Sequence, residues 1–126
     1  VFPTVDGLPV QRVRPAAVAP LPVIDLRGLP AAGRTAEAER LTAAERRIPF
    51  DLADAPPVRF RLLRLSAEDC VLLAVFHHVG VDGWSLGVLS RELTALYEAF
   101  SLGLPSPLPP LPVQYAGWAR RQSAWE

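Results

Sequence analysis

The sequence predicts a mixed α/β sandwich. Strand-like and helix-like segments follow one another in the order strands, helix, two strands, helix, helix. Residues 70–79 are apolar at successive positions until they reach two histidines, which is typical of a strand buried on both faces. Residues 84–100 are apolar at every third or fourth position, which is typical of a helix that packs along one side. At 126 residues, the chain amounts to one small domain or to part of a larger one.

The N-terminal residues 1–14 predict a β-hairpin. Apolar and polar positions alternate along them, and Asp6 and Gly7 stand between the two halves. This pair is a strong turn signal because both residues tolerate a positive φ angle. The next segments along the chain are a proline- and alanine-rich connection, a short strand and a loop, at residues 15–20, 21–26 and 28–33.

Residues 35–48 predict an amphipathic helix. Thr35 is a suitable N-cap, and Pro49 stops the helix because the residue before a proline disfavours helical backbone. The two sides of the helix differ in character. The apolar side carries Ala36, Leu41, Ala44 and Ile48, and the charged side carries Glu37, Glu39, Arg40, Glu45 and Arg46.

Two strands come next, at residues 57–65 and 70–79, with a polar turn between them. In the first strand Arg59 and Arg61 share one face, because side chains alternate along a strand. The second strand is apolar until it reaches two histidines, and Cys70 at its start is expected to be a buried, inert thiol.

Two helices complete the predicted fold. The helix at residues 84–100 is expected to end before Gly103 and Pro105. A proline-rich connector covers residues 106–112, and a shorter helix is predicted at residues 115–125.

The composition excludes several classes of function. All 13 basic residues are arginine, they balance 13 acidic residues, and they form no basic stretch, which argues against nucleic acid and anionic membranes as partners. No apolar run is long enough to cross a membrane. The single cysteine rules out an internal disulfide and fits a cytoplasmic setting. Because the sequence contains no methionine, we expect it to be an excerpt from a longer polypeptide.

The chain has only two histidines, His77 and His78, in the stretch HHVGVDGWS. Neighbouring residues on a strand point to opposite faces, so these two are not expected to bind one metal ion together, and no metal site is predicted. His78 is expected at the end of a buried strand, where apolar surroundings favour the neutral imidazole that a general base needs. Two purely structural histidines remain the alternative at this point.

Four further residues of this stretch have structural interpretations. Asp82 precedes a helix and suits an N-cap, and Gly83 permits a tight turn from strand to helix. Trp84 is expected to pack beneath that turn. Ser85 either caps the helix or lines a pocket with its hydroxyl group.

The whole string HHVGVDGWS resembles the HHxxxDG signature of condensation domains of nonribosomal peptide synthetases, in the chloramphenicol-acetyltransferase-like superfamily. The flanks agree. VFPTVDGLPVQRV, PFDLADAPPVRFRLLRL and PLPVQYAGWARRQ resemble the family's segments before and after the signature. The third match is partial, because Gly117 stands where an aspartate is usual, Trp118 replaces a tyrosine or phenylalanine, and Arg121 replaces a tryptophan. The resemblance implies a two-layer α/β sandwich of which residues 1–126 are one part, inside the N-terminal half of a single domain.

The resemblance also assigns roles to residues. It implies that His78 is catalytic and that His77 is structural. It implies that Asp82 pairs with an arginine; the usual one lies in an upstream motif that this chain lacks, and Arg59 and Arg61 are local candidates. Gly83 is implied to leave room for substrate. Trp84 and Ser85 complete the extended motif of the peptide-bond-forming members.

The implied reaction is amide formation between an aminoacyl or peptidyl thioester and the amine of a second aminoacyl group. No cofactor is expected to bind the domain, because upstream and downstream peptidyl carrier proteins present both substrates on phosphopantetheine arms. The adenylation domain of the same synthetase is a further implied partner. The alternatives are a stand-alone acyltransferase, an epimerisation domain and a degenerate, non-catalytic interaction domain. The isolated fragment is expected to be inactive.

Overall fold

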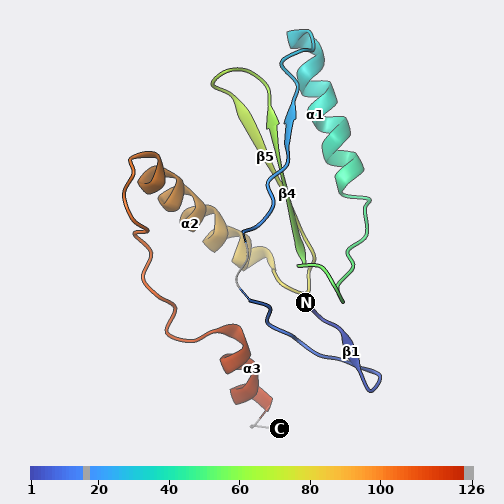
Figure 1. The fold of residues 1–126 in the computed structure, drawn as a ribbon, viewed down its shortest axis with the longest axis vertical. Helices are drawn as coiled ribbons and strands as arrows, with labels where there is room; N and C mark the ends of the chain where they lie inside the picture. Colours follow the sequence, from blue (N-terminus) through green and yellow to red (C-terminus); the bar gives the residue numbers. More distant parts are fainter. Residues whose placement is uncertain (16–17, 124–126) are drawn as a thin grey trace. The chain divides into compact units, whose positions relative to one another are not determined.

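The structure is a computed structural model that describes residues 1–15 and 18–123 (Figure 1). The chain divides into two units, Val1–Gly80 and Val81–Glu126. The predicted connection at residues 15–20 and the predicted helix at residues 115–125 each lie partly outside the described residues. The first unit contains β1 (Thr4–Val5), β2 (Leu8–Pro9), β3 (Val23–Asp25), α1 (Ala31–Glu45), β4 (Val58–Arg64) and β5 (Cys70–Phe76).

The predicted N-terminal hairpin is confirmed. Strands β1 and β2 pair antiparallel, and the two residues between them have positive φ angles, 51° at Asp6 and 80° at Gly7. The pair therefore adopts the backbone conformation that made it a turn signal. The hairpin is tied to the rest of the unit by the amide of Phe2, which donates to the carbonyl oxygen of Leu52 at 2.6 Å.

The sheet of the first unit is mixed, as predicted. Its order is β3–β4–β5, with β3 parallel to β4 and β4 antiparallel to β5. The parallel pair needs a crossover connection, which α1 supplies, whereas the antiparallel pair needs only the short turn between β4 and β5. Strand β3 is shorter than the predicted segment at residues 21–26, since only Val23–Asp25 pairs with β4.

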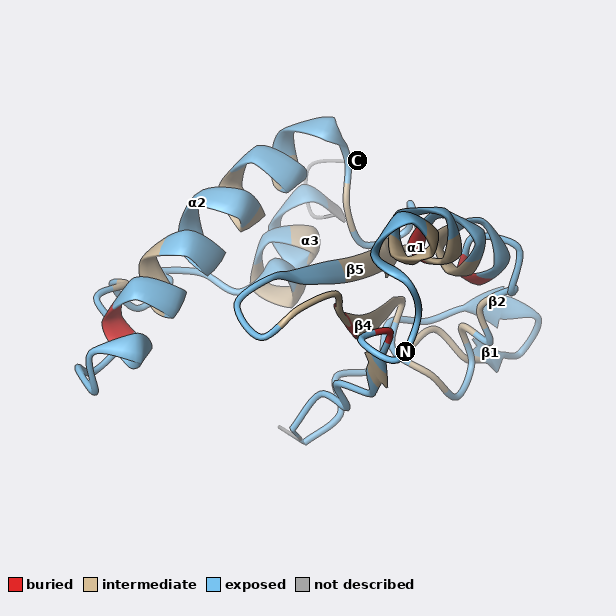
Figure 2. Ribbon diagram, turned by 90° about the horizontal axis from the view of Figure 1, so that it is seen from above, coloured by how far each residue is buried: buried red, intermediate tan, exposed pale blue. Residues whose placement is uncertain are grey.

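Helix α1 packs on one face of this sheet and forms the core of the unit with it (Figures 1 and 2). Leu63 at the middle of the sheet is fully buried, and burial of such a side chain contributes roughly 2–3 kcal/mol. Leu26 and Ala38 complete the buried cluster. Arg59, Arg61 and Leu63 lie at alternate positions of β4, so their side chains share one face of the sheet. This face is the one that α1 covers.

The predicted start of α1 was wrong. The helix begins at Ala31 and not after Thr35, and Pro30 takes the N-cap position without a side-chain hydrogen bond. Proline suits this place because its fixed φ angle is compatible with helix entry and it lacks an amide hydrogen. The first turn is anchored by Arg34, whose guanidinium donates to the carbonyl oxygens of Arg27, Leu29 and Leu65.

The prediction for β5 was wrong in length and in burial. The strand ends at Phe76, and Val71 and Leu72 in its first half are 38% and 41% exposed. As the last strand in the order, β5 lies at an edge of the sheet and is only partly covered. Cys70 is accordingly exposed, which corrects the expectation of a buried thiol.

The second unit contains α2 (Gly83–Ser101) and α3 (Tyr115–Ser123). The predicted end of α2 is confirmed, because Gly103 has a φ angle of 70°. Its amide donates to the carbonyl oxygen of Phe100 at 3.0 Å, and the amide of Leu104 donates to that of Ala99 at 2.9 Å. These two bonds form a Schellman motif, which needs a residue in the left-handed region at the glycine position.

The apolar stripe of α2 is largely exposed. Ala99 is the one buried residue among those described in α2, and Figure 2 shows most of this helix in the colour of exposed residues. The predicted apolar positions include Leu86, Leu93, Tyr97 and Phe100, which are exposed, and Leu89 and Leu96, which are partly buried. Within residues 1–15 and 18–123, no helix combines the length and the apolar character needed to span a membrane.

Candidate active site

The motif HHVGVDGWS begins in a turn that is fastened to Pro57. The amide of His77 donates to the carbonyl oxygen of Pro57 at 2.9 Å, and the amide of Gly80 donates back to that of His77 at 3.1 Å. Gly80 lies close to the same proline, since a Cβ atom there would stand 3.4 Å from its Cγ atom. The turn at residues 77–80 is therefore held against the start of β4 from both of its ends.

The side chain of His77 stabilises this turn. Its Nδ1 atom accepts a hydrogen bond of 3.1 Å from the amide of Val79. This bond uses the lone pair of Nδ1, so it forms only while Nδ1 carries no proton. The ring also meets the ring of Phe50 edge to face, with centroids 5.8 Å apart. These contacts suit the structural role that the resemblance implied for His77.

His78 lies in the turn and not in the strand, which corrects the sequence-based expectation. Its side chain is exposed and makes no hydrogen bond or ion pair with any residue that the structure describes. The strand ladder stops two residues before His78, at the pair of Val58 and Phe76, because the next residue opposite is Pro57, which has no amide hydrogen to donate. The first unit therefore does not bury the side chain of His78, contrary to what the sequence had led us to expect.

Asp82 and Ser85 form a capping box at the start of α2, which confirms the predicted N-cap. Asp82 Oδ1 accepts from the amide of Ser85 at 2.8 Å and from its hydroxyl group at 2.6 Å. The hydroxyl oxygen accepts in turn from the amide of Asp82 at 3.3 Å. The hydrogen bonds from the side chain and then the backbone of Ser85 lower the pKa of Asp82.

The two residues inside this box behave differently from expectation. Gly83 has an ordinary helical backbone, so no conformational strain requires glycine there, and a Cβ atom would meet nothing within 4 Å. Trp84 is 85% exposed and does not pack beneath the turn, which corrects that prediction. Since the box directs Ser85 toward the cap and successive residues turn by about 100°, the neighbouring indole projects outward.

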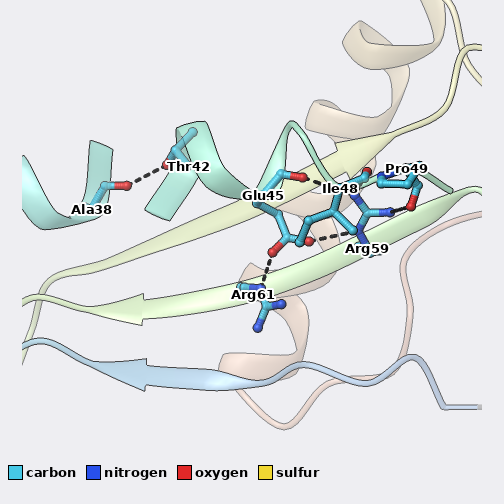
Figure 3. A network of polar contacts seen from close by, with 7 residues as sticks. All are labelled: Ala38, Thr42, Glu45, Ile48, Pro49, Arg59 and Arg61. Carbon is cyan, nitrogen blue, oxygen red and sulfur yellow. Dashed lines mark hydrogen bonds and ion pairs between the residues drawn. The ribbon is translucent and has the colours of Figure 1, made fainter. Parts of the chain in front are cut away.

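The two candidate arginine partners of Asp82 are engaged elsewhere (Figure 3). The Nε atom of Arg59 donates to Glu45 Oε1 at 2.8 Å, and the Nε atom of Arg61 donates to Oε2 of the same carboxylate. Within the described residues Asp82 makes no ion pair. Its observed role is to cap α2.

The sequence missed the burial of Glu45. The periodicity placed this residue on the charged side of its helix, yet it is only 4% exposed. Burial acts most strongly and would raise the pKa of the carboxyl group, but hydrogen bonds and charges from Arg61 and Arg59 together outweigh it, so the pKa lies below its usual range. The sequence did contain a signal for this burial. Two arginines alternate on the face of a strand that packs against a helix, and charges in such a place need an anion nearby.

The last helix carries the part of the chain that departs from the family pattern. Tyr115 and Trp118 stack at a tilt of 31°, with ring centroids 5.7 Å apart. Gly117 lies between them, and a Cβ atom there would come within 3.4 Å of Val113. The Cβ atom of an aspartate at this position would therefore make an ordinary van der Waals contact with Val113.

No group of three or more histidine, cysteine, aspartate or glutamate side chains that could hold a metal ion occurs in residues 1–15 and 18–123. The chemistry available at the motif is that of one exposed imidazole on a fastened turn, next along the chain to a capped helix start.

Comparisons with known proteins give a consistent picture. The family model of the condensation domain matches residues 1–126. The chain is 47% identical over 124 residues to phosphinothricin tripeptide synthetase PhsC of Streptomyces viridochromogenes, covering 96% of this chain and 11% of that protein. The structure resembles that of SgcC5 from Streptomyces globisporus, with a TM-score of 0.76, 31% identity, and coverage of 99% of this chain and 28% of that one.

A second solved structure, the starter condensation domain of rhizomide synthetase RzmA, has the same fold at a TM-score of 0.79 and 20% identity. The match covers 99% of this chain and 30% of that one. The chain thus spans about a tenth of its curated relative and less than a third of both solved structures. The chloramphenicol-acetyltransferase-like α/β fold expected from the sequence is confirmed by these neighbours.

Proposed function

This chain belongs to the condensation-domain family, and we propose that its 126 residues form part of the N-terminal half of one such domain in a nonribosomal peptide synthetase. The match of the family model from residue 1 to residue 126 supports the condensation-domain assignment, and coverage of less than a third of the solved structures supports the proposal that the chain is part of one domain. The likeness to a synthetase that is about nine times as long as this stretch supports a larger parent protein, since the match covers 11% of it. Condensation domains of such synthetases catalyse amide bond formation.

The proposed reaction is the transfer of an acyl group from a thioester to an amine. The amine nitrogen attacks the thioester carbonyl carbon, a carbon–nitrogen bond forms, and the carbon–sulfur bond breaks. The thiol of the donor's phosphopantetheine arm leaves, and the amine loses one proton. Upstream and downstream carrier proteins supply the two substrates, an adenylation domain of the same synthetase loads a carrier, and the domain itself binds no cofactor.

His78 is the residue to which we assign this chemistry. The observation that carries the assignment is its exposed imidazole, which is free of hydrogen bonds to the described residues while its turn is fastened to Pro57. Such a group can meet the amine, either taking up its proton or holding it in position for attack. His77 cannot do the same with its Nδ1 atom, which the amide of Val79 occupies.

Gly83 and Trp84 are proposed to border the substrate. The open space beside Gly83 supports a passage for a carrier arm there, because neither packing nor backbone strain explains a glycine at this position. The exposed indole of Trp84 is a suitable apolar surface for such an arm. Asp82 and Ser85 contribute by fixing the first turn of α2.

The test uses the complete condensation domain with both carrier proteins loaded. His78→Ala is expected to lower the rate of amide formation by roughly 10²- to 10⁴-fold, the range of general acid–base catalysis, with both carriers still loaded. Product on the downstream carrier is measured by mass spectrometry, and thermal melting reports the fold.

Glu68→Ala is the matched control, because Glu68 is exposed in the same unit and its carboxylate makes no hydrogen bond or ion pair to the described residues. It should leave both rate and melting unchanged. Near-normal product from His78→Ala would remove His78 from the reaction. If the unaltered domain makes no product from any loaded pair, a non-catalytic interaction domain is the correct description.

A further inference from the structure

An aromatic ring joins a partly buried ion cluster to the histidine turn. Phe50 meets His77 edge to face at 5.8 Å between ring centroids. The guanidinium carbon of Arg59 lies 3.9 Å from the centroid of the same ring, within the range of a cation–π contact. Phe50 therefore touches both a charged group on β4 and the first histidine of the motif.

Arg59 is held at several points. Beyond its bond to Glu45 Oε1, it donates to three backbone oxygens at the C-terminal end of α1 and just after it (Figure 3). These bonds run to the carbonyl oxygens of Glu45 at 3.2 Å, Ile48 at 2.8 Å and Pro49 at 3.2 Å. A planar guanidinium bound in this way has little freedom to rotate, so it presents a fixed surface to Phe50.

Glu45 completes this fixed cluster. Its side chain is 5% exposed, and both carboxylate oxygens are bound, one by Arg59 and the other by Arg61. The glutamate is the last residue of α1 and the two arginines lie on β4, so the cluster links the helix to the sheet near the start of β4. Pro57 and Phe50 lie shortly before this strand in the sequence.

The ring of His77 constrains the backbone on both sides of His78. Its Nδ1 atom accepts from the amide of Val79, so the hydrogen bond spans His78, which lies between the two residues. A rotation of the His77 ring away from this position would break the bond and remove one restraint on the backbone around His78. The ring has one neighbouring aromatic group among the described residues, which is Phe50.

We propose that Phe50 and Arg59 are positioning residues, which hold the His77 ring and so direct His78. The proposal rests on the proposed function of His78 as the group that meets the amine. Neither residue is expected to touch substrate. Their effect is on geometry, and a displacement of about 1 Å at a reacting group is enough to lower a rate by roughly 10²-fold.

The test compares three variants in the complete condensation domain. Phe50→Leu removes the ring but keeps an apolar side chain, whereas Phe50→Tyr keeps the ring. Phe60→Leu is the matched control, because Phe60 makes a similar edge-to-face pair, with Phe76 at 6.1 Å, in the same unit. Turnover is measured with loaded carriers as a function of acceptor concentration. The proton position on His77 is read from nitrogen NMR of labelled imidazoles, assigned with His77→Asn.

Phe50→Leu is expected to lower the turnover number by roughly tenfold with little change in KM, as a loss of alignment predicts. The His77 signals should move from the Nε2–H form to an average of both tautomers. Phe50→Tyr should restore rate and spectrum. Phe60→Leu should lower the melting temperature without changing either.

Unchanged turnover and an unchanged His77 spectrum in Phe50→Leu would overturn the proposal. Equal losses of turnover in Phe50→Leu and Phe60→Leu would also overturn it, since both would then reflect general packing. If Phe50→Leu does not fold, Arg59→Lys applies the same criteria, because lysine keeps the charge but lacks the planar surface. The NMR result does not depend on turnover, so a failure of the His78 assignment is seen separately in His78→Ala.

Discussion

Arg59 and Glu45 join the central strand of the sheet to the last residue of α1. The Nε atom of Arg59 lies 2.8 Å from Glu45 Oε1, and the carboxylate side chain is 5% exposed whereas the guanidinium side chain is 25% exposed. The sheet and the helix carry complementary charges at one end of their interface and apolar side chains at the other. Specific pairing at one end fixes the register in which the apolar end packs.

Replacing Glu45 is expected to destabilise the first unit. Glu45→Gln leaves two arginines facing a neutral amide, and we expect a loss of about 2 kcal/mol in the free energy of unfolding. This is less than the loss for wholly buried pairs because both arginines still reach water. Urea unfolding of the complete domain measures it. Glu37→Gln is the matched control on the same helix, since the loss of its surface pair with Arg40 should change the free energy of unfolding much less.

The same carboxylate predicts how stability depends on pH. The pKa of Glu45 is lower in the folded chain than its ordinary value of 4.5, so the unfolded chain binds its proton more readily. The stabilisation is therefore complete above about pH 4.5 and is lost as the pH falls through the lowered pKa. Urea midpoints between pH 7 and pH 3 should fall less steeply in Glu45→Gln. Parallel curves for the two proteins would contradict this prediction.

Asp82 is expected to act on stability through the cap of α2. Asp82→Ala removes the acceptor for two hydrogen bonds from Ser85, and loss of an N-cap lowers the free energy of unfolding. Calorimetry of the complete domain should show this loss. Asp82→Asn is the matched variant, since asparagine is also a good cap, and it should retain most of the stability. A stable but inactive Asp82→Ala domain would show instead that the carboxylate takes part in the reaction.

The 126-residue chain expressed by itself is expected to expose apolar surface and to be inactive. Among the described residues only Leu26, Ala38, Leu63 and Ala99 are buried hydrophobic residues, and Tyr97 and Leu102 are each 75% exposed. Large exposed apolar patches promote association. Binding of a hydrophobic dye and concentration-dependent light scattering should both be strong. A monomeric chain that forms amide bonds from loaded carriers would contradict this expectation.

Local signals in the sequence predicted local structure well. The turn at Asp6 and Gly7, the cap at Asp82 and the helix stop at Gly103 are all present. Each depends on hydrogen bonds and dihedral preferences within a few residues, so the sequence nearby contains all the information that decides it.

Positions that depend on distant parts of the chain were predicted poorly. Strand β5 was expected to reach residue 79, but its partner strand begins after Pro57, which cannot extend the ladder. Its burial was overestimated because hydrophobic runs indicate a buried strand without indicating whether it lies at a sheet edge. Trp84 was expected to be packed because a large apolar side chain is usually buried. Its exposure reflects the direction that the capped first turn of α2 gives it.

The sequence by itself determined the family, the mixed α/β character and the residues of the motif, because these depend on residue types and on short-range patterns. Only the tertiary structure decided which charges meet. Glu45 and Arg59 are 14 residues apart, and they pair because α1 crosses over the sheet and brings its last turn onto the face of β4 that carries the arginines. It also decided that His78 stands free on a turn while His77 is held, since that depends on Phe50 and Pro57 lying beside the end of β5.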